Sequence, residues 1–226
     1  MITFRPEVSA SSGRAYDVHR REMLFALGAG MIGAALFRAK PVSGQGSPFL
    51  LRPPGARENN PDPVELTRCT RCTACIRVCP TGGLQPAVFE AGPGGFATPV
   101  LVPRLGYCDF ACTACGQVCP TQAIPPLELE AKRQKLIGTA AIDEKRCIAW
   151  AEHKPCIVCE EMCPLPHKAI RLETRRVNGP DGSLTTLDLP HVLEDSCIGC
   201  GICEYKCPVS GEAAIRITVS NPSNPI

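Results

Sequence analysis

The stretch CTRCTACIRVCP, residues 69–80, holds four cysteines at the spacing Cys-x2-Cys-x2-Cys-x3-Cys and closes them with a proline. Three cysteines in so short a loop can bind three corners of a small inorganic cube, and the fourth stands about one helical turn beyond the third. Pro80 fixes its own φ angle and has no N–H, so it turns the chain away from the site. The spacing therefore predicts a ligand loop for an iron–sulfur cluster.

The same arrangement occurs four times, and it uses all 16 cysteines of the chain. A proline follows the last cysteine of each group. The groups are Cys69, Cys72, Cys75 and Cys79; Cys108, Cys112, Cys115 and Cys119; Cys147, Cys156, Cys159 and Cys163; and Cys197, Cys200, Cys203 and Cys207. This fourfold internal repeat predicts four [4Fe–4S] clusters, with the sixteen cysteines as iron ligands and no catalytic residue.

Three other interpretations of the cysteines fit less well. A Cys-x2-Cys-x2-Cys triplet is poorly placed to form disulfides. Zinc sites usually come as two separated pairs of cysteines. Cys108, Cys112 and Cys115 have the spacing of a radical-SAM site, but Cys119 and a proline follow at once, and such a site leaves one iron without a protein ligand. An enzyme with an open iron is therefore the weaker hypothesis, and an electron carrier is the stronger one.

Composition and charge narrow the function further. Of 226 residues, 44% are hydrophobic and 5% aromatic, and that hydrophobic share counts the 16 cysteines. The chain has few large apolar side chains for one big core, so the clusters are expected to organise it. The formal net charge is +2, which argues against nucleic acid as a partner. Four oxidised clusters with their thiolates would change this charge to about −6.

The N-terminal residues carry an export pattern. Arg20 and Arg21 precede an apolar run at residues 23–37, and basic residues follow it. A paired arginine before such a run is typical of a twin-arginine signal, which exports proteins that have already folded. Since no good cleavage site follows, residues 1–40 are predicted to be a signal or a retained membrane anchor. Six prolines at residues 41–66 predict an extended linker. Residues 67–218 are predicted to form the polyferredoxin domain, and residues 219–226 a flexible tail.

Between the motifs the sequence predicts an α+β fold of short strands and turns. Alternating residues at 170–174 and a strand at 184–189 flank a turn at 178–182, which indicates a hairpin. A second hairpin is expected from 87–90 and 99–102, around a glycine turn at 92–95. Residues 140–142 lead into the third motif as a strand. Residues 127–137 fit a short helix or a strand.

The expected architecture is two small, loop-rich, ferredoxin-like modules, each with two clusters, at about 67–126 and 140–218 with a connector between them. The motifs could pair first with second and third with fourth, or first with fourth and second with third. The hairpins favour the first of these pairings, but the sequence leaves both open. Trp150, in the eight-residue gap of the third motif, is either a docking residue for a redox partner or part of an apolar lid over the cluster.

The whole layout resembles the MauM/NapG family of exported ferredoxin-type proteins. The resemblance rests on the paired arginines, on LLRPPGA at residues 50–56, on the four motifs, on the long gap between Cys147 and Cys156, and on the closing Cys207-Pro208. It covers about residues 20–218.

This resemblance implies a periplasmic electron-transfer subunit at the inner membrane. Its donor would be a membrane-embedded iron–sulfur quinol oxidase of the NapH type, and its acceptor a c-type cytochrome or a terminal reductase. The alternative is an electron-transferring subunit of an oxidoreductase that faces the cytoplasm, with the paired arginines a coincidence.

Overall fold

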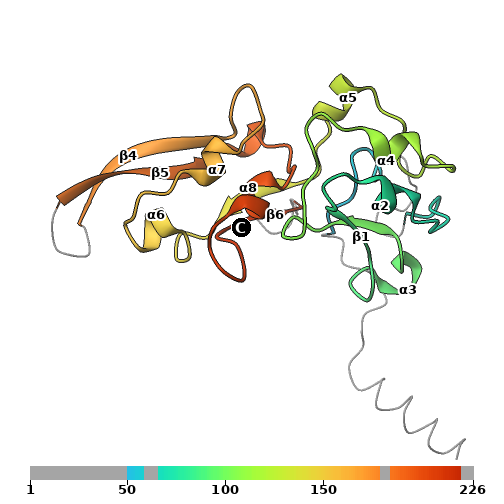
Figure 1. The fold of residues 1–226 in the computed structure, drawn as a ribbon, viewed down its shortest axis with the longest axis horizontal. Coiled ribbons are helices and arrows are strands. Elements are labelled where there is room, and N and C mark those ends of the chain that lie inside the picture. Colours follow the sequence, from blue (N-terminus) through green and yellow to red (C-terminus); the bar gives the residue numbers. More distant parts are fainter. Residues whose placement is uncertain (1–49, 59–65, 179–183, 220–226) are drawn as a thin grey trace, which may run out of the picture. The chain divides into compact units, whose positions relative to one another are not determined.

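The computed structural model describes residues 50–58, 66–178 and 184–219 (Figure 1). The predicted export signal with Arg20 and Arg21 lies outside these residues, as does the predicted tail beyond residue 219. None of the helices in the described parts has the length and apolar character that crossing a bilayer requires.

In each cysteine motif the third cysteine lies within a short helix. These helices are α2 (Ala74–Val78), α4 (Ala114–Gln117), α7 (Val158–Glu161) and α8 (Ile202–Lys206). The closing Cys-Pro pair explains why the helices do not continue. A residue before proline is pushed towards extended backbone, and Cys79 and Cys207 have ψ angles of 112° and 123°.

Three antiparallel pairs of strands complete the fold (Figure 1). They are β1 (Leu84–Pro86) with β2 (Pro99–Leu101), β3 (Thr139–Ile142) with β6 (Ile215–Thr218), and β4 (Ile170–Asn178) with β5 (Leu184–Val192). The β3–β6 pair joins the segment before the third motif to the segment after the fourth. The third and fourth motifs therefore lie in the stretch of chain between these two paired strands.

The hairpin expected between the third and fourth motifs is confirmed as β4–β5, with Ile170 opposite Val192. The other hairpin differs from its prediction. Its first strand is Leu84–Pro86, because the chain beyond Pro86 turns inward and buries Ala87 and Ala91 against Val100. The glycines predicted as a turn form the short helix α3 (Gly92–Gly95).

The remaining short elements lie around the motifs. The stretch at 127–137 contains a helix, α5 (Leu129–Arg133). The third motif has an additional helix, α6 (Ile148–Ala151), and a 3-10 helix precedes the fourth (Glu194–Ser196). The strand expected at 140–142 is confirmed as β3.

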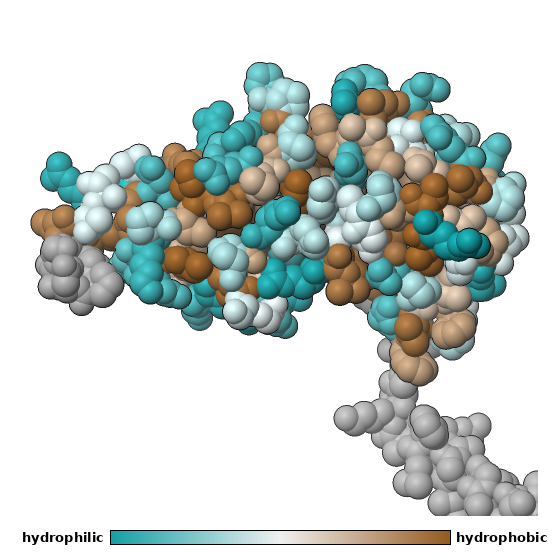
Figure 2. Space-filling model, in the orientation of Figure 1, coloured by the Kyte–Doolittle hydropathy of each residue, from teal (hydrophilic) through white to brown (hydrophobic). Residues whose placement is uncertain are grey.

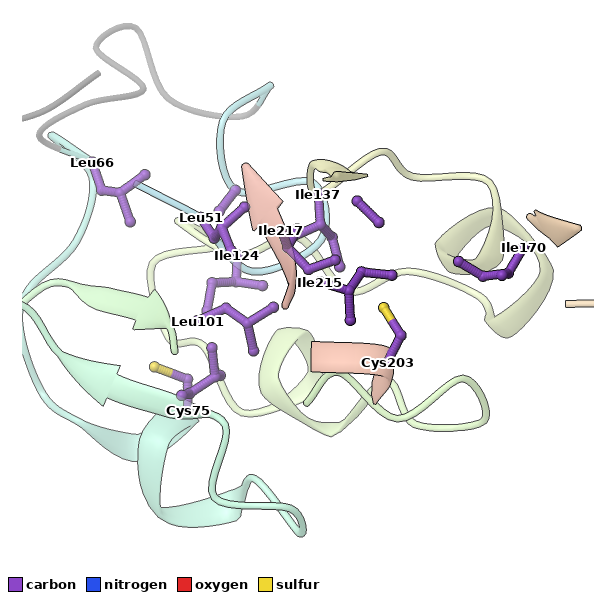
Figure 3. Packing of buried hydrophobic residues seen from close by; sticks show 13 residues of the cluster. Leu51, Leu66, Cys75, Leu101, Ile124, Ile137, Ile170, Cys203, Ile215 and Ile217 are labelled. Carbon is purple, nitrogen blue, oxygen red and sulfur yellow. The ribbon is translucent and has the colours of Figure 1, made fainter. Parts of the chain in front are cut away.

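One buried cluster of apolar side chains connects segments from all four motifs (Figure 3). Leu101 and Ile124 pack in it together with Ile137, Ile215 and Ile217, so residues before and after the connector share a core. Ligand cysteines belong to the same cluster: in Figure 3 the sulfur of Cys75 lies beside Leu101 and that of Cys203 near Ile215. On the outside, apolar residues lie scattered among hydrophilic ones over the face shown in Figure 2.

The segment at residues 50–58 differs from its prediction as part of an extended linker. Leu51 and Ala56 are buried in the core, and the carbonyl of Leu51 accepts a hydrogen bond of 2.9 Å from the N–H of Leu101. Arg52 is 2% exposed and donates to Thr98 Oγ1 at 2.9 Å and to the Pro99 carbonyl at 3.0 Å. The chain turns at residues 54–58, where the N–H of Ala56 donates to the carbonyl of Pro53 at 3.0 Å, so this proline-rich stretch packs instead of standing free.

Candidate iron–sulfur sites

The sixteen cysteines line four cavities, four cysteines in each, and no cysteine lines two of them. We name each cavity after the motif that supplies three of its cysteines. Site 1 has Cys69, Cys72, Cys75 and Cys119; site 2 has Cys108, Cys112, Cys115 and Cys79; site 3 has Cys147, Cys156, Cys159 and Cys207; and site 4 has Cys197, Cys200, Cys203 and Cys163.

Every motif thus places three cysteines in its own site and sends its fourth to the neighbouring site. The structure brings the first motif together with the second and the third with the fourth, which the sequence left open. Helix α2 packs against α4, and α7 packs against α8. Because the last cysteine stands just beyond its helix, this side-by-side packing points it into the partner motif's cavity. The exchange is the arrangement known from two-cluster ferredoxins.

The ligand loops bend through left-handed backbone. In the fourth motif, Gly199 and Gly201 have φ angles of 71° and 86°. The corresponding positions of the first motif, Arg71 and Thr73, have φ angles of 58° and 61° without the freedom of glycine. This costly conformation directs the N–H of Arg71 at the sulfur of Cys69, 3.4 Å away. An N–H aimed at a thiolate stabilises its negative charge.

Burial shapes the acidity of the thiols. It raises the pKa of Cys75 and Cys200 to about 11, and that of Cys115 and Cys159 to about 12. Neighbouring thiols add to each shift by Coulombic repulsion. Four thiolates crowded into one apolar cavity need positive charge between them. The cysteine sets are therefore suited to hold a cationic iron centre.

A polynuclear cluster fits these cavities better than a single ion does. In a tetrahedral zinc site the sulfurs lie about 2.3 Å from one metal and thus close together. In the described parts of the chain, no three His, Cys, Asp or Glu side chains converge closely enough to hold one metal ion. All sixteen cysteines are free thiols, and each set of four lines a cavity of its own.

Site 2 has a buried cation beside one of its ligands. Lys132, on α5, is 4% exposed, and its ammonium group donates to the carbonyl of Asp109. Burial raises the pKa of Cys108, while the charge of Lys132 and its hydrogen bond to the thiol oppose that shift. Cys79 of the same site has a lowered pKa: burial raises it, but hydrogen bonds from Thr81 and from the backbone of Leu84 and Gly83 outweigh the burial.

The walls of site 2 include residues that the sequence did not single out for a site. Pro53 and Pro54 line the cavity together with Leu84, Leu101 and Tyr107. The two prolines were assigned to the linker on composition. Their place in the LLRPPGA stretch, which carried part of the resemblance, was the signal that could have found them.

Trp150 does not line site 3, although its neighbour Ile148 and its partner Pro190 do. The indole N–H donates to the Pro190 carbonyl at 3.1 Å, and the ring meets that of His191 edge-on at 5.1 Å. Trp150 therefore fixes the β4–β5 hairpin against the third motif. Trp150 thus reaches the wall of site 3 through Pro190, and its two predicted roles, docking and lid, both stay predictions.

Comparison with known proteins also indicates an iron–sulfur protein. The model of the 4Fe-4S binding domain matches residues 190–210, around the fourth motif. The methylamine utilization ferredoxin-type protein MauM of Methylorubrum extorquens is 34% identical over 169 residues, which cover 74% of this chain and 71% of the relative.

The chain belongs to the MauM/NapG family of ferredoxin-type proteins.

Within this family, MauM of Paracoccus denitrificans is 31% identical over 96% of this chain and 90% of its own length. The ferredoxin-type protein NapG of Escherichia coli K12 is 33% identical over 84% of this chain and 79% of its own length. No solved structure matches the chain. As a member of the MauM/NapG family, the protein is a ferredoxin-type iron–sulfur protein with a role in electron transfer.

Proposed function

We propose that the chain carries four [4Fe–4S] clusters, one in each of sites 1 to 4, in two ferredoxin-like modules made by motifs one and two and by motifs three and four. The supporting observation is the sorting of sixteen cysteines into four separate cavities of four. Each bound cluster would supply one reversible electron step at a potential between about −700 and +450 mV. The chain's own contribution is to hold the thiolates, exclude water with apolar walls and direct N–H groups at the sulfurs.

Metal analysis tests the number and kind of clusters. The full-length chain, purified without oxygen, should contain about sixteen iron atoms and as much acid-labile sulfide. After reduction it should give the EPR signals of [4Fe–4S] centres. The Cys72→Ala protein should lose about a quarter of the iron. A colourless protein, or one that holds zinc without sulfide, would refute the proposal.

We further propose that the protein acts on the periplasmic face of the bacterial inner membrane, after export by the twin-arginine route. The paired Arg20 and Arg21 before the apolar run support this location. Changing both to lysine should leave cluster-loaded protein in the cytoplasm, whereas Arg14→Lys, a few residues upstream, should export normally. Unchanged export of the double variant would favour the cytoplasm-facing alternative.

The proposed donor is a membrane-embedded iron–sulfur quinol oxidase of the NapH type, and the proposed acceptor a c-type cytochrome or a terminal reductase. This assignment rests on membership of the MauM/NapG family. In membrane vesicles that contain such an oxidase, a quinol should reduce the added protein. If vesicles without the oxidase reduce the protein at the same rate, the donor is wrong.

A further inference from the structure

Sites 2 and 4 meet directly, although they belong to different motif pairs. The N–H of Cys108, which lines site 2, donates to the carbonyl of Cys200, which lines site 4, at 2.8 Å. The two ligand sets are therefore joined directly through the backbone.

The fourth motif packs against the other half of the chain without spare room. A Cβ atom on Gly199 would lie 2.3 Å from the carbonyl oxygen of Gly138, and one on Gly201 would lie 3.0 Å from Pro103 Cβ. Both glycines also have left-handed backbone. The Cys197–Cys203 loop is thus fitted to the surface formed by the connector and by the residues before Cys108.

Arg104, four residues before Cys108, stabilises the contact between the fourth motif and the residues before Cys108. Its guanidinium donates to four carbonyls at the end of the fourth motif: those of Glu204 and Cys207, both at 3.1 Å, Val209 at 2.6 Å and Gly211 at 3.1 Å. Next to it, the rings of Tyr107 and Tyr205 lie 5.4 Å apart. An arginine that satisfies so many carbonyls from another part of the chain fixes their relative position.

Within each pair the sites are also neighbours. Helix α2, which carries Cys75 of site 1, packs against α4, which carries Cys115 of site 2. Helix α7, with Cys159 of site 3, packs against α8, with Cys203 of site 4. The contacts thus run from site 1 to site 2, from site 2 to site 4 and from site 4 to site 3. Site 1 also reaches the surface, since Cys72 is exposed while Cys200 and Cys203 are buried.

We propose that the four sites form a linear electron path in the order 1–2–4–3, which crosses between the two motif pairs where Cys108 contacts Cys200. This inference rests on the proposed four-cluster function. Each step moves one electron from a reduced to an oxidised centre, with no bond made or broken. The order of the sites in space therefore differs from the order of the motifs in the sequence, and sites 1 and 3 are the two ends of the path.

Magnetic coupling between reduced clusters tests the order, because it weakens steeply with distance. Two single-ligand variants of the full chain are compared, Cys112→Ala for site 2 and Cys72→Ala for site 1, each required to lose about one quarter of the iron. Without site 2, the reduced protein should show one isolated centre, site 1, together with one coupled pair. Without site 1, it should show three coupled centres and no isolated one. The reverse pattern would overturn the order.

The other motif pair supplies the mirror test if these variants fail to assemble. Cys200→Ala, which removes a ligand of site 4, should isolate site 3, whereas Cys156→Ala at site 3 should leave three coupled centres. An isolated centre after Cys156→Ala, but not after Cys200→Ala, would overturn the order. Failure of the underlying function looks different, because the unmodified protein would then lack the iron and sulfide of four clusters.

Discussion

Lys132 shows how one side chain can set the properties of a single site. Its buried ammonium group lies against Cys108, and positive charge or hydrogen bonding near a ligand sulfur favours the reduced, more negative cluster. We expect Lys132→Met to lower the reduction potential of one cluster by roughly 60 to 130 mV, the equivalent of about 1.5–3 kcal/mol for a hydrogen bond to a charged group. An EPR-monitored redox titration measures this shift.

The matched control for Lys132 is Lys135→Met. Lys135 lies three residues further along, is about a third exposed and pairs with Glu58 at the surface. Its loss should leave all potentials within experimental error. Lys132→Arg should restore part of the shift, because it returns the charge. Equal potentials in the Lys132→Met and unmodified proteins would contradict the role assigned to this residue.

The raised thiol pKa values predict how cluster loading depends on pH. At neutral pH the thiols of Cys75, Cys115, Cys159 and Cys200 are protonated, since their pKa values lie at about 11 to 12. Ligand binding requires thiolate, whose fraction rises about tenfold per pH unit below the pKa. Reconstitution of cluster-free protein with iron and sulfide should therefore be faster at pH 9 than at pH 7. A rate that is constant or falls over this range would count against buried, protonated ligands.

At the scale of elements, the β4–β5 hairpin forms one wall of site 3 through Pro190, and Trp150 holds it there. Trp150→Phe keeps most of the packing and loses one hydrogen bond, worth about 1 kcal/mol. Trp150→Ala loses the packing as well and should cost more. We expect iron loss to a chelator to be fastest in Trp150→Ala, intermediate in Trp150→Phe and unchanged in Leu184→Ala, at the exposed far end of β5.

The segment at residues 50–58 works in a similar way for site 2. Arg52 joins it to β2 through Thr98 and Pro99, and this places Pro53 and Pro54 on the cavity wall. Arg52→Met leaves buried polar groups without these partners, at a cost of about 1–3 kcal/mol. The thermal midpoint of the loaded protein should fall, while that of Arg77→Met, a change at an exposed arginine, should not. Equal midpoints would show that the segment contributes little to the fold.

For the molecule as a whole, local sequence features were predictable and long-range ones were not. The motif spacing and the hairpin of residues 170–174 and 184–189 follow from nearby residues, although the strands extend to Asn178 and Val192 in the structure. The assignment of Cys79 and Cys119 to each other's motifs depends on α2 packing against α4, and nothing in the spacing specifies that. Residues 50–58 were misjudged because a proline-rich stretch has the same composition whether it is packed or free. The burial of Lys132 likewise depends on where the connector folds back.

The exposure of Cys72 predicts that site 1 is the most oxygen-sensitive of the four sites. Dissolved oxygen and peroxide attack an iron–sulfur centre where solvent can reach it, and Cys72 of site 1 is the one exposed ligand among the sixteen. Damage in aerated buffer should therefore begin at that edge and reach site 4, with Cys200 and Cys203 buried, last of all. A partly oxidised protein would keep its buried clusters after the cluster of site 1 has been destroyed. It would therefore stop exchanging electrons with a partner at site 1 while it still shows most of its visible absorption.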